Sequence, residues 1–267
     1  MTRASYWQDM TTRDFADRSA AEWIAVLPIA AIEQHGPHLP LSTDTVIAEG
    51  LVKRCVAALP ADLPAIFLPV QAIGNSDEHV DHAGTLTLSW ELAVKAWTRI
   101  GESVHRAGLR KLVIVTSHGG NVQAMDLVTR ELRLTLGMLA VATSWNRMGL
   151  PEGLISPQER SLGIHGGEVE TAMVLALAPD LVRMDQAQNF QSAQLDFATT
   201  FAHLRAYGPS QFGWKAADLN PQGVVGNARA AQAETGRRIL EFQAAGFLSL
   251  LRDVQNFDLT LLRGAET

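Results

Sequence analysis

Glu33, His35 and Asp44 stand close together in a polar stretch that follows an apolar segment at positions 23–32. The apolar segment has the length and composition of a buried strand, so we expect the polar stretch to leave a strand end as a loop. Side chains alternate along an extended chain, which places Glu33 and His35 on one face. Two carboxylates and an imidazole on a loop stiffened by two prolines favour a divalent metal site. The alternative is a surface loop in which Asp44 caps a helix, and this stretch alone leaves both open.

Three further candidates lie in two other polar segments: His118, His165 and Glu168. With the first group they supply carboxylates and imidazoles that suit two divalent ions of the Zn or Mn type, one carboxylate bridging. Paired ions of this kind hold a water that loses a proton near neutral pH and can attack a carbonyl carbon. His165 would enter the same cleft as a proton shuttle.

Each candidate also has an ordinary structural interpretation. His118 could cap its turn, and Glu168 near a helix start is favoured by the helix dipole whether or not a metal binds. Glu170 is two residues further along, roughly 200° around a helix, so we expect it to point away from Glu168. Trp145 follows a predicted strand and lines a pocket or packs in the core. A structural role is expected for His38. His79 and His82 flank a loop that could face the cleft, and each is expected either to be solvated or to support the ligands from behind.

Strand and helix patterns alternate along the chain. Strands are predicted at 66–70, 111–116 and 138–143, in addition to the segment at 23–32. Helices are predicted at 45–59, 89–106, 121–136, 172–178 and 227–254. Alternation of this kind predicts an α/β layered fold with a mostly parallel sheet, in which ligands bind beyond the carboxyl ends of the strands.

Two regions are harder to interpret from pattern. About twenty residues after Trp145 are rich in Gly, Pro and Ser, which suggests a functional loop rather than a plain connection. Residues 180–226 are mixed, and their glycines suggest loops or short hairpins. No linker or repeat divides the chain, so residues 1–267 are interpreted as a single domain.

Composition narrows the class of protein. The 267 residues are 47% hydrophobic with a net charge of −6, which argues against nucleic acid or an anionic membrane as the main partner. The single cysteine, Cys55, excludes an intramolecular disulfide framework and fits a reducing compartment. The first residues lack a signal-peptide layout, and no apolar run has the length of a membrane span. We therefore expect a cytoplasmic enzyme that acts on a small molecule.

Three blocks of sequence resemble the creatininase (creatinine amidohydrolase) family, and the resemblance covers most of the chain. The blocks are Leu27-Pro-Ile-Ala-Ala-Ile-Glu-Gln-His-Gly-Pro-His-Leu-Pro-Leu-Ser-Thr-Asp44, Ser117-His-Gly-Gly-Asn121 and His165-Gly-Gly-Glu-Val-Glu-Thr171. The resemblance implies an α/β/α sandwich, a binuclear centre of Zn or Mn, with Fe as a further option, and a homo-oligomer, usually a hexamer. It implies ligand roles for Glu33, His35, Asp44 and His118, with Asp44 bridging, and a proton-handling role for His165.

The chain departs from creatininase itself at two points. Creatininase has a metal-binding Glu just after the His of the second block, where this chain has Gly119-Gly120-Asn121, and we infer that Glu168 supplies the missing ligand. Creatininase also has a substrate-contacting Trp four residues before the His of the third block, where this chain has Ser161. Trp145 matches the family's other pocket Trp and is predicted to bind substrate. The departures point away from creatinine as the substrate.

We therefore expect a binuclear metal-dependent amidohydrolase that cleaves the C–N bond of a small amide, cyclic amide or formamide through a metal-bridging hydroxide. One alternative with the same ions is hydrolysis of a C–C bond in a cyclic polyol ketone of the inosose type. The other is a non-catalytic subunit that binds a metal or a metabolite, although such a subunit has no need of His165.

Overall fold

A parallel four-stranded sheet forms the centre of the computed structural model, which describes residues 5–16 and 22–263. The strands follow the order β2-β1-β3-β4. Their bounds are β1 (Ile24–Ile29), β2 (Ala65–Phe67), β3 (Lys111–Thr116) and β4 (Leu139–Ser144). In the register, Lys111 pairs with Ile24 on one side and with Leu139 on the other. The predicted parallel sheet is confirmed.

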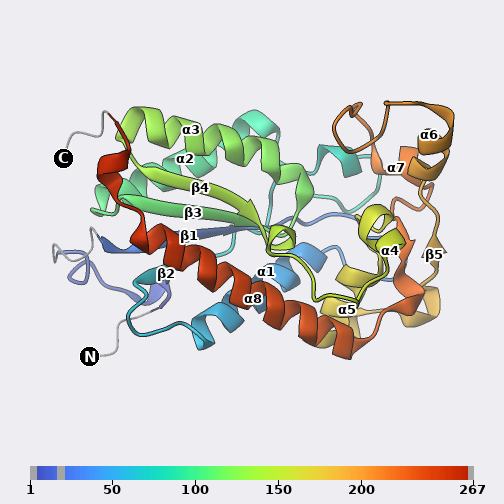
Figure 1. Cartoon of the computed structure of the whole chain (residues 1–267), viewed down its shortest axis with the longest axis horizontal. Helices are drawn as coiled ribbons and strands as arrows, with labels where there is room; N and C mark the ends of the chain where they lie inside the picture. Colours follow the sequence, from blue (N-terminus) through green and yellow to red (C-terminus); the bar gives the residue numbers. More distant parts are fainter. Residues whose placement is uncertain (1–4, 17–21, 264–267) are drawn as a thin grey trace.

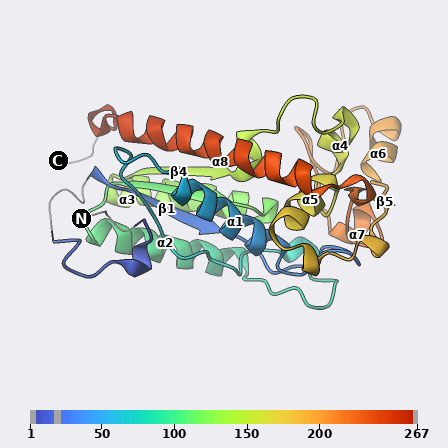
Figure 2. The same ribbon diagram turned by 90° about the horizontal axis from the view of Figure 1, so that it is seen from below.

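Helices cover both faces of this sheet and make a three-layer α/β/α sandwich (Figures 1 and 2). One layer contains α1 (Thr43–Ala57), α5 (Glu168–Leu177) and α8 (Ala233–Asn256). The other contains α2 (Trp90–Arg106) and α3 (Val122–Leu136). No helix among the described residues is long and apolar enough to cross a lipid bilayer.

The apolar run of β1 explains how the sheet is buried on both faces. Ile24 and Val26 belong to the core on the α1 and α8 side, whereas Ala25 and Leu27 belong to the core on the α2 and α3 side. Because successive side chains point to opposite faces, a strand covered on both sides must be apolar at every position. All six residues of β1 are buried accordingly.

The predicted helix ends agree with the structure to within a few residues in the first half of the chain. Ser89 immediately precedes α2, and α3 ends at Leu136 before Gly137. Gly137 adopts φ 66°, a left-handed conformation that favours glycine, and its N–H bonds the carbonyl of Arg133. This cap turns the chain into β4.

The second half contains more regular structure than its sequence indicates. The connection after β4 begins with the 3₁₀ turn η5 (Trp145–Met148) and contains α4 (Pro157–Leu162), which Ser156 caps by accepting from the N–H of Glu159 at 3.1 Å. Further on, β5 (Asn189–Phe190) pairs antiparallel with β6 (Gly226–Asn227). Two short helices lie between them, α6 (Gln194–Thr200) and α7 (Ala216–Leu219). The remaining single turns are η1 (Trp7–Asp9), η3 (Asp77–His79), η4 (Gly119–Asn121), η6 (Pro179–Leu181), η7 (Met184–Gln186), η8 (Ala228–Ala230) and η9 (Leu259–Leu261).

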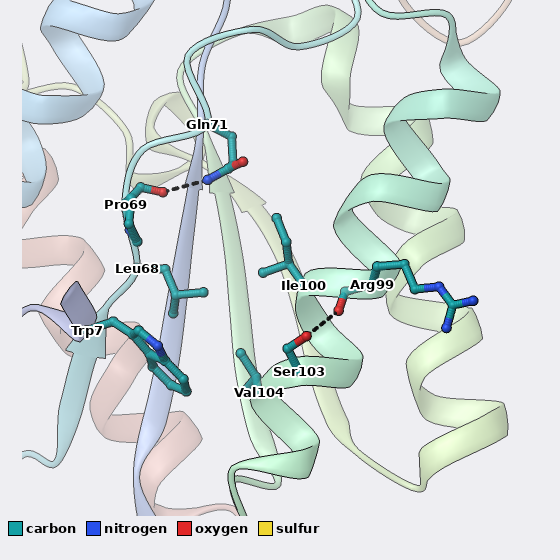
Figure 3. Close-up of a pocket in the computed structure, with 8 residues that line it drawn as sticks. All are labelled: Trp7, Leu68, Pro69, Gln71, Arg99, Ile100, Ser103 and Val104. Carbon is teal, nitrogen blue, oxygen red and sulfur yellow. Dashed lines mark hydrogen bonds between the residues drawn. The ribbon is translucent and has the colours of Figure 1, made fainter. Parts of the chain in front are cut away.

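The arrowheads of β3 and β4 point to the end of the molecule that carries α4 to α7 (Figure 1), and β1 and β2 run parallel to them. A separate hollow of about 370 Å³ lies beside α2 instead (Figure 3). Its lining is Trp7, Leu68, Pro69, Gln71, Arg99, Ile100, Ser103 and Val104. This lining has no carboxylate or imidazole, and Figure 3 shows the guanidinium of Arg99 directed away from the apolar side chains. The candidate residues Glu33, His35 and His118 instead follow β1 and β3 at the carboxyl edge of the sheet.

Candidate metal centre

The loop after β1 brings its own two ends together. Gly36 has φ 69° and reverses the chain, and the N–H of Glu33 bonds the carbonyl of Leu41 at 2.9 Å. Asp44, in the first turn of α1, consequently returns to the loop that carries Glu33 and His35. All three residues are at most 1% exposed.

His35 directs an unprotonated nitrogen at the acidic groups. Its Nδ1 lies 3.1 Å from the carbonyl of Glu33, so Nδ1 carries the proton and donates it. Its Nε2 then has a free lone pair, 3.7 Å from Oδ2 of Asp44 and 3.8 Å from Oε2 of Glu170. Burial, followed by the nearby His165, lowers the pKa of His35 to about 3, so the ring stays neutral, the form that binds metals.

His118 reaches the same cluster from the end of β3. Its Nδ1 lies 3.1 Å from Oε1 of Glu33 and 3.9 Å from Oδ2 of Asp44, while its Nε2 donates to the carbonyl of Asn75 at 3.0 Å. Burial lowers the pKa of His118, but the neighbouring acids Glu33, Glu78 and Asp44 together outweigh burial, so the net shift of this pKa is well upward. A cation bound by these residues would take the place of the proton on Nδ1, because a coordinating imidazole must be neutral.

The buried acceptor atoms of this cluster fit a divalent cation. Among the described residues, these atoms have no hydrogen-bond partner: Glu33 Oε1 and Oε2, His35 Nε2 and Asp44 Oδ2. Burial, and then Glu33, raise the pKa of Asp44 well above its usual value. For Glu33, burial raises the pKa, but the neighbouring histidines, His118 first among them, together outweigh burial, so this pKa lies well below its usual value. Unpaired buried carboxylates are costly, and a metal ion would offset that cost.

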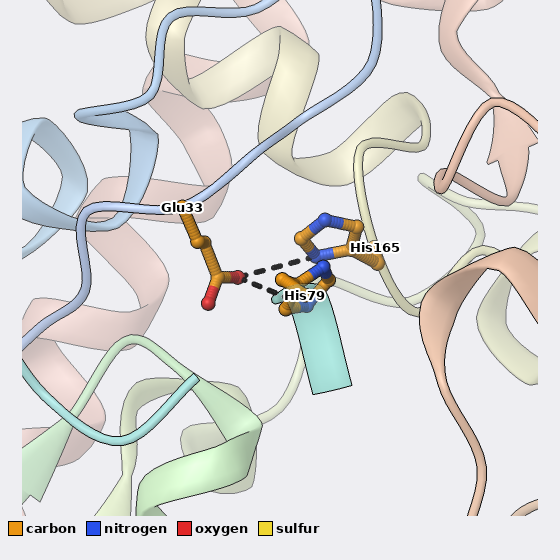
Figure 4. Close-up of side chains that lie close together, drawn as sticks. All are labelled: Glu33, His79 and His165. Atoms are coloured by element: carbon orange, nitrogen blue, oxygen red, sulfur yellow. Dashed lines mark ion pairs between the residues drawn. The ribbon is translucent and has the colours of Figure 1, made fainter. Parts of the chain in front are cut away.

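Three overlapping groups have ligand atoms within 4.8 Å of one another. They are Glu33, His35 and Asp44; His35, His165 and Glu170; and Glu33, His79 and His165. The first two groups share His35 and differ in their acids, an arrangement that suits two neighbouring ions with mixed N and O ligands. Figure 4 shows Glu33 facing His79 and His165 across the third group.

Glu168 is the predicted ligand that the structure does not bring to the cluster. Glu168 lines a small polar cavity of about 100 Å³ with Ser156 and Asn189, and its backbone N–H bonds Glu159 at 2.8 Å. Glu170 is directed into the cluster instead, and its Oε2 accepts from the N–H of Gly166 at 2.6 Å. Both acids lie in the first turn of α5, and two residues span roughly 200° of a helix, so only one of them can face the centre.

Trp145 is buried in the core. Its side chain is 1% exposed and packs on Phe247 of α8 with ring centroids 4.6 Å apart. Of the two roles expected for Trp145, packing in the core is the one that this position matches. A substrate-binding role for Trp145 stays a prediction.

Residues that the sequence did not single out as ligands complete the cluster: Glu170, His79, Glu78 and Gln34. Glu78 and His79 follow β2, which pairs with β1, so their polar loop reaches the same sheet edge. Oε1 of Glu78 lies 3.3 Å from Nε2 of His118. Residues that follow adjacent parallel strands lie at the same edge of the sheet. Once the order of the strands is known, this rule would have identified Glu78 and His79.

The buried His38 predicts acid lability of the metal-free protein. Its Nε2 lies 3.0 Å from the carbonyl of Gly166, and burial lowers the pKa of His38 from 6.5 to about 4. Between pH 6.5 and pH 4, His38 therefore binds a proton in the unfolded chain but not in the folded protein. Titration of His38 does not affect the free energy of unfolding above pH 6.5. Below pH 6.5 it lowers this free energy by about 1.4 kcal/mol per pH unit, until the pH reaches about 4.

Urea unfolding of the wild type and His38→Gln between pH 7.5 and pH 4.5 measures this contribution. Glutamine can donate to the same carbonyl but does not titrate, whereas all other groups titrate in both proteins. The stability difference between the two should shrink as pH falls below 6.5. A difference that is constant with pH would contradict the assignment.

Comparison with known proteins gives consistent matches along most of the chain. A sequence model of a family described as creatinine amidohydrolase matches residues 8–251. A mycofactocin precursor peptide peptidase of Mycobacterium tuberculosis is 34% identical over 220 residues, which cover 80% of this chain and 78% of that protein. Creatinine amidohydrolase of Pseudomonas putida is 26% identical over 271 residues, which cover 95% of this chain and 98% of that protein. A solved structure described as creatininase Mn has a TM-score of 0.75 and 25% identity, over 94% of this chain and 98% of that chain.

Proposed function

This chain belongs to the creatinine amidohydrolase family, and we propose that it is a binuclear metal-dependent hydrolase that cleaves the C–N bond of a small amide, cyclic amide or formamide. The observation that carries the proposal is the set of buried acceptor atoms without hydrogen-bond partners on Glu33, His35 and Asp44, which lie within 4.8 Å of one another. Side chains from other segments, His118, His165 and Glu170, approach the same atoms. Solved relatives described as creatininase Mn and as a Zn–Zn type support Mn or Zn as the ions. We also propose a homo-oligomer, a hexamer in size, which light scattering can test.

The proposed ligands are Glu33, His35, Asp44, His118 and Glu170. Oδ2 of Asp44 lies 3.7 Å from Nε2 of His35 and 3.9 Å from Nδ1 of His118, a position that would suit the bridging carboxylate. Two divalent ions, when bound there, would polarise the scissile carbonyl and activate water as the nucleophile. His35 and His118 would bind as neutral imidazoles through the nitrogen that does not donate to a backbone carbonyl. The surrounding protein excludes bulk water, because the ligand side chains of the first loop are almost fully buried.

His165 is placed to move the proton. Its Nε2 donates to the carbonyl of Gln34 at 2.8 Å, so Nδ1 has the free lone pair. Nδ1 lies 3.6 Å from Oε1 of Glu33, within the cluster. A lone pair at this atom can accept a proton from the attacking water and return it to the leaving nitrogen.

Replacing His165 should separate metal binding from turnover. His165→Ala is expected to retain both ions and to lower kcat by roughly 10²–10⁴-fold, the range for loss of a general acid–base. Elemental analysis and initial rates measure the two effects, and His203→Ala, at an exposed histidine, is the matched control. Loss of an ion from His165→Ala would make this residue a ligand instead.

A substrate panel tests the reaction class. The purified protein, with its metal content determined, is incubated with a formamide, a cyclic amide, a short peptide and a cyclic polyol ketone. The peptide is included because the peptidase relative is 34% identical, against 26% for the creatinine enzyme. Release of amine or formate supports the proposal, whereas product from the ketone alone supports C–C hydrolysis. A preparation fully active without metal would refute the proposal, and bound metal without turnover of any compound would support the non-catalytic alternative.

A further inference from the structure

The side-chain amide of Gln34 has one orientation that its neighbours permit. Its Oε1 accepts from the N–H of Gly36 at 3.0 Å, and its Nε2 donates to the carbonyl of Gly223 at 2.6 Å. If the amide were flipped, its oxygen would face the carbonyl oxygen of Gly223 and its NH₂ group would face the N–H of Gly36. Gln34 is 6% exposed, so solvent does not replace these partners.

This orientation fixes the tautomer of His79. The second hydrogen of Gln34 Nε2 is directed at Nδ1 of His79, 2.8 Å away, so Nδ1 is the acceptor. A ring nitrogen that accepts a hydrogen bond carries no proton, and an imidazole always carries at least one. That proton is on Nε2, which lies 3.4 Å from Oε1 of Glu33 (Figure 4).

His165 presents an unprotonated nitrogen to Glu33, whereas His79 presents a protonated one. Gln34 Nε2 also lies 3.3 Å from Nε2 of His165, but both amide hydrogens already have shorter bonds to Gly223 and His79. The carbonyl of Gln34, which can only accept, therefore takes the proton of His165 Nε2. The two rings lie 4.3 Å apart between centroids. Nδ1 of His165, with a lone pair, and Nε2 of His79, with a proton, lie 3.6 Å and 3.4 Å from Oε1 of Glu33, which are close electrostatic contacts and not hydrogen bonds.

We propose that Gln34 and His79 form a positioning pair, in which Gln34 holds His79 in its Nε2–H tautomer and this N–H orients the carboxylate of Glu33. The inference rests on the proposed function, because Glu33 is a ligand there. His79 is then not a metal ligand, although its ring lies within reach of one ligand group. Outer donors of this kind hold ligating carboxylates in place, and their loss typically lowers metal affinity by about 10–100-fold.

The tautomer is measured directly by ¹⁵N NMR of protein labelled at histidine, with the His79 signals assigned by their absence in His79→Gln. In metal-free protein we expect a protonated Nε2 and an unprotonated Nδ1 for His79. In protein loaded with ¹¹³Cd²⁺, we expect no ¹¹³Cd–¹⁵N coupling for His79. A protonated Nδ1, or a coupling to the metal, would overturn the inference. The metal-free result decides the tautomer even if the proposed enzymatic function fails.

Zinc affinity, measured by competition with a chromogenic chelator, tests the consequence for Glu33. His79→Leu should weaken affinity by about 10–100-fold, and His79→Gln, whose amide N–H can take the place of Nε2–H, should recover to within about 3-fold of wild type. His82→Leu in the same loop is the control and should bind as wild type does. Equal affinity of the two His79 variants, with their Tm unchanged, would contradict a positioning role for the N–H.

Discussion

Glu170→Gln is expected to lose one of two divalent ions and at least about 10²-fold of kcat/KM, whereas Glu168→Gln keeps both. The two acids are neighbours in the first turn of α5, but only Glu170 reaches the cluster, with Oε2 3.8 Å from Nε2 of His35. The glutamine oxygen can still accept from the N–H of Gly166, so the loop that carries His165 stays in place. The substitution therefore removes a charge and a ligand with little effect on the fold.

Metal stoichiometry by elemental analysis after gel filtration, with kcat and KM for any substrate found by the panel, measures both variants. Glu168→Gln is the matched control, since its backbone bond to Glu159 is unchanged by the substitution. Metal loss from Glu168→Gln with retention in Glu170→Gln would restore the ligand set inferred from the family resemblance.

Local patterns were sufficient to predict the sheet and most helices. The β-branched run at 111–116 predicts β3 with the observed bounds, and Gly137 ends α3 as expected. The segment between α5 and α8 was not predictable in detail. Its elements, such as β5 and β6, are two residues long and are stabilised by contacts distant in sequence, which leave no periodic pattern.

Site residues that directly follow adjacent strands could be predicted from the sequence. Site residues whose position depends on how helices and strands pack could not. Glu33, His35 and His118 meet because β1 and β3 are adjacent and parallel, a consequence of the α/β pattern. The choice between Glu168 and Glu170 depends on the rotation of α5 about its axis, which contacts with α8 and α1 determine. The approach of His79 to the site depends on β2 lying beside β1. The sequence pattern predicts the strands but not their order in the sheet.

At the opposite edge of the sheet, a buried lysine bonds the carbonyls at the end of α8. Lys111, at the start of β3, is 8% exposed, and its Nζ donates to the carbonyls of Val254 at 2.8 Å, Gln255 at 2.7 Å and Phe257 at 3.0 Å. These carbonyls end α8 or follow it, so they lack helical partners, and a cation there also complements the helix dipole. Lys111 begins β3, and His118 of the candidate metal centre follows the other end of the same strand.

Lys111→Met is therefore expected to lower stability by about 2–4 kcal/mol, because three carbonyls lose a charged donor in a buried site. For a chain of this size the Tm should fall by roughly 4–16 °C, measured by thermal unfolding of the metal-loaded protein. Lys53→Met, at an exposed lysine of α1, is the control and should change stability by less than about 0.5 kcal/mol. At temperatures where Lys111→Met is folded, its metal content and kcat should equal those of the wild type, since no ligand is displaced. A loss of metal with unchanged Tm would contradict this separation of fold anchor and metal centre.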